Sequence, residues 1–301
     1  MMIFNTKIKE HCKVLYKNGD DLRMDVLIMQ IISLLDFLMK ELSVDLRLTI
    51  YDVLAYSKND GVMAFVGDSM TVHDIQKKYS TIGKYFEELI EQQVNPPRKT
   101  DTHAKKALFE DGNDQTLMQR KRDEARREII DNYIESMAGY CVLSYILGLG
   151  DRHLENVMIT NKGKFWHLDF GYAMGEDPKM SAPPFKITPD MIDAFGGKES
   201  PNYLKFTNKC VAYYLYLRKS ANLVINLLYL MVDSELIINP NKGIEMKASH
   251  VIDTVVNKLK VDKDDKEAEM HFKITLQSSL DSFWGKFNDW QHYMNVEYLK
   301  K

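Results

Sequence analysis

The sequence predicts an α+β fold of two lobes, a small strand-rich N-terminal lobe and a larger, mostly helical C-terminal lobe. The chain has 301 residues, more than one typical hydrophobic core uses. Short alternating segments with turn signals gather near the N-terminus, whereas apolar residues recur at helical spacing through most of the second half. We therefore expect an N-terminal lobe at residues 1–93, a mobile insertion at 94–127 and a C-terminal lobe at 128–301.

The composition is that of a globular protein with a net charge of -3, which gives no reason to expect a nucleic-acid partner. The apolar runs at 137–149 and 221–232 are too short to span a bilayer. Three cysteines, Cys12, Cys141 and Cys210, lie far apart without metal-ligand spacing. Because no signal-peptide pattern opens the chain, we expect reduced, buried thiols in a cytosolic protein.

The N-terminal lobe is predicted to contain a short strand at 13–17, followed by an Asn-Gly-Asp-Asp turn. Apolar residues at helical spacing then predict a helix at 22–41, with Asp25 in its first turn. These apolar residues are Ile28, Ile32, Leu35 and Met39. Lys17, at the end of the strand, should therefore lie close to Asp25.

Two further strands are predicted at 48–56 and 62–66, joined by an Asn-Asp-Gly hairpin turn. A helix at 71–91 follows. Residues 95–119 lack apolar periodicity and are expected to be a mobile insertion. The charges of residues 120–127 alternate in sign, which favours the solvated start of the next helix over a nucleic-acid site.

The C-terminal lobe is predicted to begin with a buried helix at 129–149 and to hold a loop rich in Pro and Gly at 172–188. Helices are then expected at 189–195, 201–219, 221–233, 244–259 and 267–280. The polar residues of this lobe gather between the first helix and the loop.

This stretch, GDRHLENVMITNKGKFWHLDFG at 150–171, holds two polar clusters beside two alternating segments. The alternating segments flank an Asn-Lys-Gly turn, which is the pattern of a β-hairpin. A hairpin brings the residue before its first strand beside the residue after its second, so Asn156 and Asp169 should face one point. An amide oxygen and a carboxylate are hard ligands suited to Mg²⁺ held together with substrate phosphates.

Asp151 lies five residues before Asn156, the separation found in the catalytic loop of protein kinases. In that loop the Asp meets the substrate hydroxyl and the Asn holds metal. Together with the Asp-Phe-Gly sequence that begins at Asp169, these residues predict phosphate transfer. The order Asp151-Arg152-His153 reverses the His-Arg-Asp of protein kinases and resembles that of the phosphatidylinositol 3/4-kinases and their protein-kinase relatives.

The resemblance covers essentially the whole chain and is closest to class III phosphatidylinositol 3-kinases, the vacuolar-sorting type. It is carried by KNGDDLRMD, SMAGYCVLSYILGLGDRHLENVMIT and HLDFGYAMGEDPK. The resemblance implies a two-lobed protein-kinase-like fold and transfer of the ATP γ-phosphate to the 3-hydroxyl of phosphatidylinositol, with Mg²⁺ or alternatively Mn²⁺. It also implies peripheral binding to endosomal, vacuolar or autophagic membranes, a role in vesicle trafficking and autophagy, and a regulatory kinase-like subunit as a further partner.

The resemblance assigns an ATP-binding set. Its members are Lys17, Asp25, Tyr51, Met63, Phe65, Val66, Met158 and Leu168. Lys17 matches the lysine that holds the ATP phosphates, and Asp25 matches the helix acid that orients it. Tyr51 matches a tyrosine near the adenine pocket that pairs with this acid, while Met63 would control the depth of the pocket. The segment Ala64-Phe65-Val66 matches the hinge whose backbone meets adenine.

The catalytic groups follow from the same match. Either Asp151 or His153 would take the proton of the substrate hydroxyl, and the two stay open as alternatives because both belong to the same loop. His167 and Lys17 would stabilise charge on the transferring phosphate.

The loop at 172–188 matches the activation segment of the family, and its charge predicts the lipid. Its basic residues are Lys179 and Lys186, and they are offset by Glu176 and Asp177. A phosphorylated head group adds about -1.5 to -2 charges for each monoester, which a site must match with clustered basic residues. We therefore expect unmodified phosphatidylinositol to be preferred over its 4,5-bisphosphate, with Lys179 as the lipid-phosphate contact.

The last part of the chain carries an aromatic stripe at helical spacing, followed by two lysines. The membrane-facing residues expected here are Phe287, Trp290, Met294, Lys300 and Lys301. Such a stripe can lie in a membrane interface or pack onto the catalytic lobe. The resemblance favours the membrane, because a terminal amphipathic helix of class III lipid kinases contacts it.

Two alternatives to a phosphatidylinositol 3-kinase are weighed. One is a phosphatidylinositol 4-kinase or a related protein kinase. The other is a truncated, non-enzymatic scaffold, because the chain begins shortly before Lys17 and is expected to lack most of the phosphate-covering loop. The catalytic residues at Lys17, Asp151, Asn156 and Asp169 argue against the scaffold.

Overall fold

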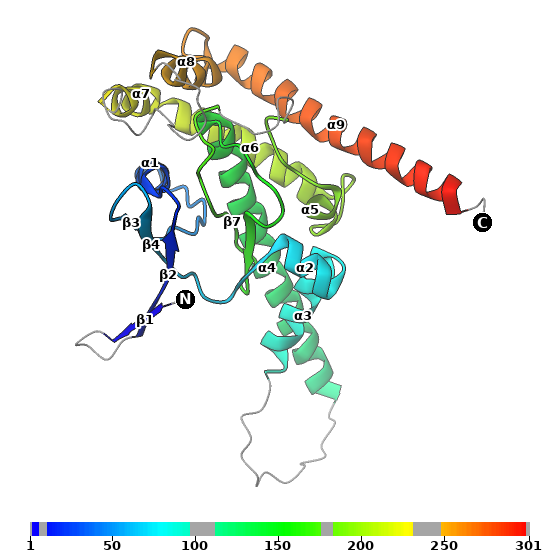
Figure 1. Cartoon of the computed structure of the whole chain (residues 1–301). Coiled ribbons are helices and arrows are strands. Elements are labelled where there is room, and N and C mark those ends of the chain that lie inside the picture. Colours follow the sequence, from blue (N-terminus) through cyan, green and yellow to red (C-terminus); the bar gives the residue numbers. More distant parts are fainter. Residues whose placement is uncertain (1, 6–10, 97–111, 176–182, 231–247, 299–301) are drawn as a thin grey trace.

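The computed structural model describes residues 2–5, 11–96, 112–175, 183–230 and 248–298, and these form two lobes (Figure 1). The smaller lobe is built on an antiparallel sheet of strand order β1-β2-β4-β3. Its strands are β1 (Met2–Asn5), β2 (His11–Asn18), β3 (Val53–Ala55) and β4 (Asp60–Ala64). The predicted α+β class with a two-lobed arrangement is confirmed.

Helix α1 (Arg23–Glu41) packs beside this sheet, as predicted from its apolar spacing. Its buried apolar residues are Leu27, Ile28, Met29, Ile31, Ile32, Leu35 and Met39. Strand β2 pairs with β4 so that Lys17 lies opposite Gly61 and Leu15 lies opposite Met63. Side chains two residues apart share one face of a sheet, so Leu15 and Lys17 point to the same side.

The larger lobe holds the second sheet, of strand order β5-β6-β7, with helices around it. Its strands are β5 (Ser69–Thr71), β6 (Val157–Thr160) and β7 (Phe165–His167). Strands β6 and β7 form the predicted hairpin around residues 161–163. Gly163 occupies the turn with a φ of 78°, and a Cβ there would lie 2.6 Å from the Ile129 carbonyl oxygen. Only glycine fits this turn without strain.

The helices of the larger lobe agree with most of the predicted positions. They are α2 (Val72–Tyr79), α3 (Ile82–Val94), α4 (Gly112–Leu147), α5 (Pro189–Asp193), α6 (Pro201–Arg218), α7 (Ala221–Leu230), α8 (Ala248–Leu259) and α9 (Asp265–Tyr298). The predicted helix at 71–91 is two helices, because Ser80, with a φ of 73°, ends α2 and Thr81 caps the start of α3. None of the described helices combines the length and apolar character needed to cross a membrane.

The boundary between the lobes differs from the predicted one at residue 93. Strand β5 pairs with β6, and α3 packs along α4, so residues 69–94 belong to the larger lobe. The chain passes between the lobes at residues 65–68. The short strand β5 was hidden in the sequence because three residues show no clear alternation.

Helix α4 also begins earlier than predicted, since residues 112–127 are helical and only part of the expected insertion at 94–127 remains outside the described elements. Ion pairs accompany this exposed part of the helix. Arg122 lies 2.9 Å from Glu91, and Arg126 lies 2.6 Å from Glu87, whereas the buried rings of Phe86 and Tyr133 join α3 to α4 further along.

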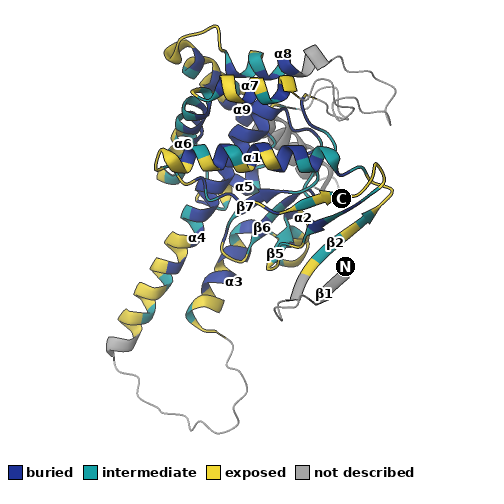
Figure 2. Ribbon diagram, turned by 90° about the vertical axis from the view of Figure 1, so that its left-hand side faces the viewer, coloured by how far each residue is buried: buried dark blue, intermediate teal, exposed yellow. Residues whose placement is uncertain are grey.

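The centre of α4 forms the core of the larger lobe, and Figure 2 shows the helix changing from exposed at its N-terminal end to buried at its C-terminal half. Tyr133, Met137 and Tyr140 are fully buried there. Cys141 and Cys210 are buried free thiols, as predicted, whereas the side chain of Cys12 lies outside the described residues. The buried helix delivers the chain directly to the polar stretch that follows Leu149.

Candidate active site

Backbone hydrogen bonds hold the polar loop after α4 beside the segment that follows β7. Gly150 N–H donates to Tyr172 O at 2.9 Å, and Gly175 N–H donates to Gly148 O at 2.9 Å. The two segments approach closely because Gly148 has no side chain: its φ is 57°, and a Cβ there would lie 2.4 Å from Gly175 N. The loop and the segment thus form one rigid base for the polar side chains.

The hairpin places Asn156 and Asp169 on neighbouring strand ends. Leu168 N–H donates to Asn156 O at 3.0 Å, which continues the β6–β7 pairing to the residue before Asp169. The Asn156 side-chain N–H₂ donates to Asp151 O at 3.1 Å, so its amide oxygen is the atom left to ligate a cation. Both aspartates have left-handed backbone, with φ of 51° at Asp151 and 64° at Asp169.

Lys17 joins the two lobes at this point. Its Nζ lies 2.8 Å from Asp20 Oδ2 and 3.4 Å from Asp169 Oδ2. Burial lowers the pKa of Lys17, but the hydrogen bond to Asp20 and the charges of Asp169 and Asp25 outweigh it and raise the pKa overall. A cationic lysine therefore lies beside the Asp169 carboxylate, and its ion pairs are with Asp20 and Asp169, whereas the expected neighbour was Asp25.

Asp25 is 2% exposed and accepts a hydrogen bond from Phe170 N–H at 3.0 Å. It thereby connects helix α1 to the Asp-Phe-Gly segment. Burial raises the pKa of Asp25 to about 7, while the Phe170 N–H opposes this shift and the negative charge of Asp169 adds to it. The carboxyl group changes charge near neutral pH because its one backbone donor does not replace the hydration it loses.

Replacing Asp25 with asparagine should change the pH dependence of stability. The pKa of Asp25 is about 7 in the folded protein, against an ordinary value of 3.8. Between these values the folded state binds more protons, so the free energy of unfolding falls as pH rises, by about 2–4 kcal/mol in total, and levels off above about pH 7. The Asp25→Asn variant should lack this fall, so it should gain stability relative to the wild type between pH 4.5 and pH 8 in urea unfolding.

The Asp21→Asn variant is the control for this experiment. The hydrogen bond from Arg23 is the main cause that lowers the pKa of Asp21, so Asp21 stays ionised in both states over this pH range. Its unfolding free energy should follow that of the wild type in parallel. Parallel curves for Asp25→Asn as well would contradict a proton bound at Asp25.

Arg152 was not assigned a role from the sequence, and the structure makes it the central connector of the site. Its guanidinium donates to Gly150 O at 2.7 Å, to Leu168 O at 3.0 Å and to Asp169 O. It also lies 5.4 Å from the centre of the Phe170 ring. Burial lowers the pKa of Arg152, and Asp169 opposes this shift. A planar guanidinium with five N–H donors can bind three carbonyls on two segments. In the sequence, the position of Arg152 between Asp151 and His153 was the feature that could have indicated its role.

His167 and His153 differ in environment. His167 is buried, its Nδ1 lies 3.2 Å from Ser144 Oγ, and burial together with the charge of Arg152 lowers its pKa well below the usual range. It is therefore neutral and contributes no positive charge of its own, so the predicted charge stabilisation at this position is limited to hydrogen bonding. His153 Nε2 lies 3.8 Å from Asp151 Oδ2 on the partly exposed side of the loop. The two alternative bases are thus neighbours.

The residues predicted to meet adenine lie along β4 and the connection after it. Met63 is buried, consistent with a residue at the back of a pocket. Phe65 N–H donates to Lys13 O at 2.9 Å, whereas the Val66 N–H has no hydrogen-bond partner among the described residues and is the donor left for a ligand. Met158 and Leu168, on the hairpin below, are partly buried against the core.

Tyr51 differs from its expected pairing. Its ring packs edge-on against Trp166, with centroids 5.4 Å apart, and its hydroxyl is buried without a hydrogen bond in the described part of the chain. The Asp25 carboxylate is close enough to raise the pKa of Tyr51, after the larger effect of burial, but it binds Phe170 N–H instead.

Several predicted residues cannot be placed. Lys179 lies outside the described residues, as do the side chains of Phe287, Trp290, Met294, Lys300 and Lys301. Lys186 is described and partly buried at the end of the loop. The helix expected near the C-terminus is the second half of α9, which ends at Tyr298.

The donor set at the hairpin fits a hard cation that takes few protein ligands. In the described residues no three His, Cys, Asp or Glu side chains gather into a metal cage. One amide oxygen, at Asn156, and one carboxylate, at Asp169, remain. Mg²⁺ is commonly held by one or two carboxylates together with substrate phosphates, and the residues present fit that requirement.

The chain is similar in sequence to known proteins. The family model described as "Phosphatidylinositol 3- and 4-kinase" matches residues 11–241. The chain is 36% identical to "Phosphatidylinositol 3-kinase VPS34" of Candida glabrata over 282 residues, which are 94% of this chain and 28% of that protein. It is also 36% identical to the protein of the same name from Saccharomyces cerevisiae, over 93% of this chain and 28% of that one. The soybean (Glycine max) "Phosphatidylinositol 3-kinase, root isoform" is 36% identical over 89% of this chain and 29% of its own length. The chain thus spans less than a third of the length of these relatives.

Proposed function

The chain belongs to the phosphatidylinositol 3- and 4-kinase family, and on this premise we propose that it transfers the γ-phosphate of ATP to the 3-hydroxyl of phosphatidylinositol. The observation that carries the proposal is the approach of Lys17 Nζ to within 3.4 Å of Asp169 Oδ2, across the lobes. This contact joins a phosphate-binding cation to a metal-binding carboxylate. The names of the relatives, which are phosphatidylinositol 3-kinases, support the choice of lipid and hydroxyl.

In this proposal Asn156 and Asp169 hold Mg²⁺, or alternatively Mn²⁺. When bound, the metal ion neutralises phosphate charge and orients the γ-phosphate. Lys17 places a positive charge beside the same phosphate. Arg152 holds the backbone of Asp169 against the catalytic loop through its hydrogen bonds. The Val66 N–H binds the adenine edge.

The chemical step is an in-line displacement at phosphorus. The 3-hydroxyl oxygen of inositol forms a bond to the γ-phosphorus, the bond to the β-phosphate oxygen breaks, and ADP leaves. The hydroxyl proton passes to Asp151 or His153. Because these side chains lie 3.8 Å apart, the proton acceptor can be held in place by its neighbour.

The membrane and the partner at which the reaction takes place are part of the same proposal. The lipid substrate requires a peripheral position on a membrane, and we propose endosomal, vacuolar or autophagic membranes with a regulatory kinase-like subunit as partner. The aromatic stripe at Phe287, Trp290 and Met294, with Lys300 and Lys301, is proposed as the membrane contact. Lys179 and Lys186 are proposed to face the lipid phosphate.

We expect phosphatidylinositol to be phosphorylated at least about tenfold faster than its 4,5-bisphosphate, a difference of about 1.4 kcal/mol in the barrier. The reason is the balanced charge of the loop at 172–188, which leaves additional phosphate groups unpaired. The measurement is a vesicle assay with radiolabelled ATP at equal surface density of each lipid, with vesicles lacking inositol lipid as control.

Product analysis separates the alternatives. Phosphate on the 3-hydroxyl supports the proposal, whereas phosphate on the 4-hydroxyl would identify a 4-kinase. Faster turnover of the bisphosphate would overturn the lipid preference. Absence of transfer to any lipid or peptide, in a folded protein, would favour the scaffold.

A further inference from the structure

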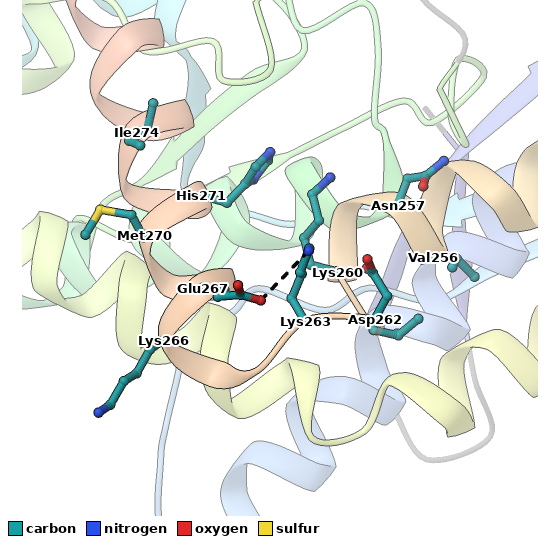
Figure 3. Close-up of a pocket in the computed structure, with 11 residues that line it drawn as sticks. Val256, Asn257, Lys260, Asp262, Lys263, Lys266, Glu267, Met270, His271 and Ile274 are labelled. Carbon is teal, nitrogen blue, oxygen red and sulfur yellow. Dashed lines mark ion pairs between the residues drawn. The ribbon is translucent and has the colours of Figure 1, made fainter.

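A groove of about 820 Å³ lies between the C-terminal end of α8 and the first turns of α9, and none of its lining residues belongs to the candidate active site. Its apolar lining includes Val256, Val261, Met270 and Ile274. Figure 3 shows Met270 and Ile274 on one side and Val256 on the other, with Lys260 and Lys263 between them. Met270 is 60% exposed and Ile274 is 62% exposed, and they lie one helical turn apart on the same face of α9. Among the described residues, charged side chains border this exposed stripe.

Side chains from α6 hold the groove in shape, and Tyr214 O–H donates to Lys258 O at 2.9 Å. Arg218 donates to Leu259 O at 3.0 Å, to Lys260 O at 2.9 Å and to Lys263 O, and it pairs with Asp265. Asp264 also accepts a hydrogen bond from Glu267 N–H at 2.8 Å, which caps the start of α9. A groove fixed in this way needs little reorganisation to bind a ligand.

The charges around the groove are only partly paired. Lys263 lies 3.9 Å from Glu267, so these two charges offset each other. Within the described residues Lys260 and Lys266 make no side-chain ion pair, and neither does Asp262. The imidazole of His271 is neutral, because burial and the nearby Lys260 both lower its pKa. In the described part of the chain, two unpaired cations and one unpaired anion therefore border the apolar lining of the groove.

We propose that the α8–α9 groove binds an amphipathic helix of a partner protein, one that presents an apolar ridge flanked mainly by acidic side chains. The lining residues 266–274 extend over about 12 Å at 1.5 Å per residue, which matches two turns of a bound helix. The unpaired lysines are complementary to carboxylates on the flanks of that helix, and Met270 adapts to the side chains of the ridge. The groove goes beyond the proposed lipid kinase activity, because none of its residues belongs to the catalytic site.

A membrane surface fits the groove less well. Apolar residues in a concave groove contact protruding side chains, whereas a bilayer would reach only the rims. The observations therefore favour a helix over a lipid surface.

The test uses the full chain and a fluorescein-labelled helical peptide with leucines at i, i+4, i+7 and glutamates beside them. The matched control peptide carries lysines in place of the glutamates. We expect the acidic peptide to bind preferentially, and Ile274→Gln to weaken its binding at least about tenfold, because the variant places a polar amide where the bound helix would bury an apolar side chain. A double change, Lys260→Gln with Lys266→Gln, should remove the preference for the acidic peptide. Hydrogen exchange should show protection at residues 256–274.

Leu204→Gln is the control variant, since Leu204 is 61% exposed on α6 and does not line the groove. It should leave peptide binding unchanged. Thermal unfolding checks each variant, and Met270→Gln replaces Ile274→Gln if the latter does not fold. Lack of binding by the acidic peptide, equal binding of both peptides or equal weakening by Leu204→Gln would overturn the proposal. So would binding to phosphatidylserine vesicles that Ile274→Gln abolishes while the peptide fails to bind.

Discussion

The Asp169→Asn variant is expected to transfer phosphate at least about a thousandfold more slowly than the wild type, a loss of several kcal/mol of transition-state stabilisation. An amide cannot neutralise a bound Mg²⁺, and it also loses the charge that attracts Lys17, now 3.4 Å away. The backbone should be unaffected, because Asn Oδ1 can still accept the hydrogen bond from Gly171 N–H, which Asp169 Oδ1 accepts at 3.2 Å. Single-turnover assays over a range of Mg²⁺ concentrations measure the effect.

Two controls test whether the loss of turnover comes from the missing metal ligand rather than from unfolding or from any change of aspartate to asparagine. Far-ultraviolet circular dichroism and urea unfolding should show a folded variant. Asp68→Asn, at an exposed aspartate that also has a positive φ of 55°, should keep wild-type turnover. Retained transfer by Asp169→Asn with an unchanged Mg²⁺ dependence would remove Asp169 from the metal site.

The second large effect is expected for Arg152→Lys, which should lower kcat about a hundredfold and reduce the free energy of unfolding by about 2–4 kcal/mol. Arg152 is 6% exposed and donates to three carbonyls on two segments. A lysine ammonium lacks the planar fork that reaches all three, so one or more buried carbonyls lose a partner. Because Arg152 is a positioning residue without substrate contact, KM for ATP should change much less than kcat.

Arg126→Lys is the matched control. The Arg126 guanidinium pairs with Glu87 at 2.6 Å on the exposed surface, where such pairs contribute about 0–1 kcal/mol. Steady-state kinetics and urea unfolding of both variants separate a buried connector from an ordinary arginine. Equal, small effects in the two variants would contradict the role of Arg152.

The parts of the site that follow from local pattern could be predicted from the sequence. A hairpin has a fixed geometry, so its turn and alternation were enough to place Asn156 beside the segment that leads into Asp169. Helix α1 was similarly evident from its apolar spacing, which placed Asp25 in the first turn. These features follow from the side-chain periods of two residues in a strand and 3.6 residues in a helix, which the order of apolar and polar residues reveals.

The remaining parts depend on contacts that no periodicity encodes. Arg152 acts on backbone carbonyls, whose directions are set by the loop conformation rather than by residue type. The hydrogen-bond partner of Asp25 is the Phe170 N–H from the other lobe, and Lys17 makes its hydrogen bonds to Asp20 and Asp169. The first turns of α4 are held to α3 by arginine–glutamate pairs, which a search for apolar spacing overlooks.

The left-handed backbone at Asp151 and Asp169 narrows the residues that evolution can place there. Aspartate, asparagine and histidine adopt positive φ more readily than other side chains, and glycine does so freely. Asparagine or glycine at these positions would preserve the chain path but remove the carboxylate. Glutamate would preserve the charge, but it is less suited to this backbone and its longer side chain would displace that charge. Aspartate combines a carboxylate with a short side chain that tolerates this backbone, so a single change to asparagine or glycine at either position would remove the proposed chemistry while keeping the chain path.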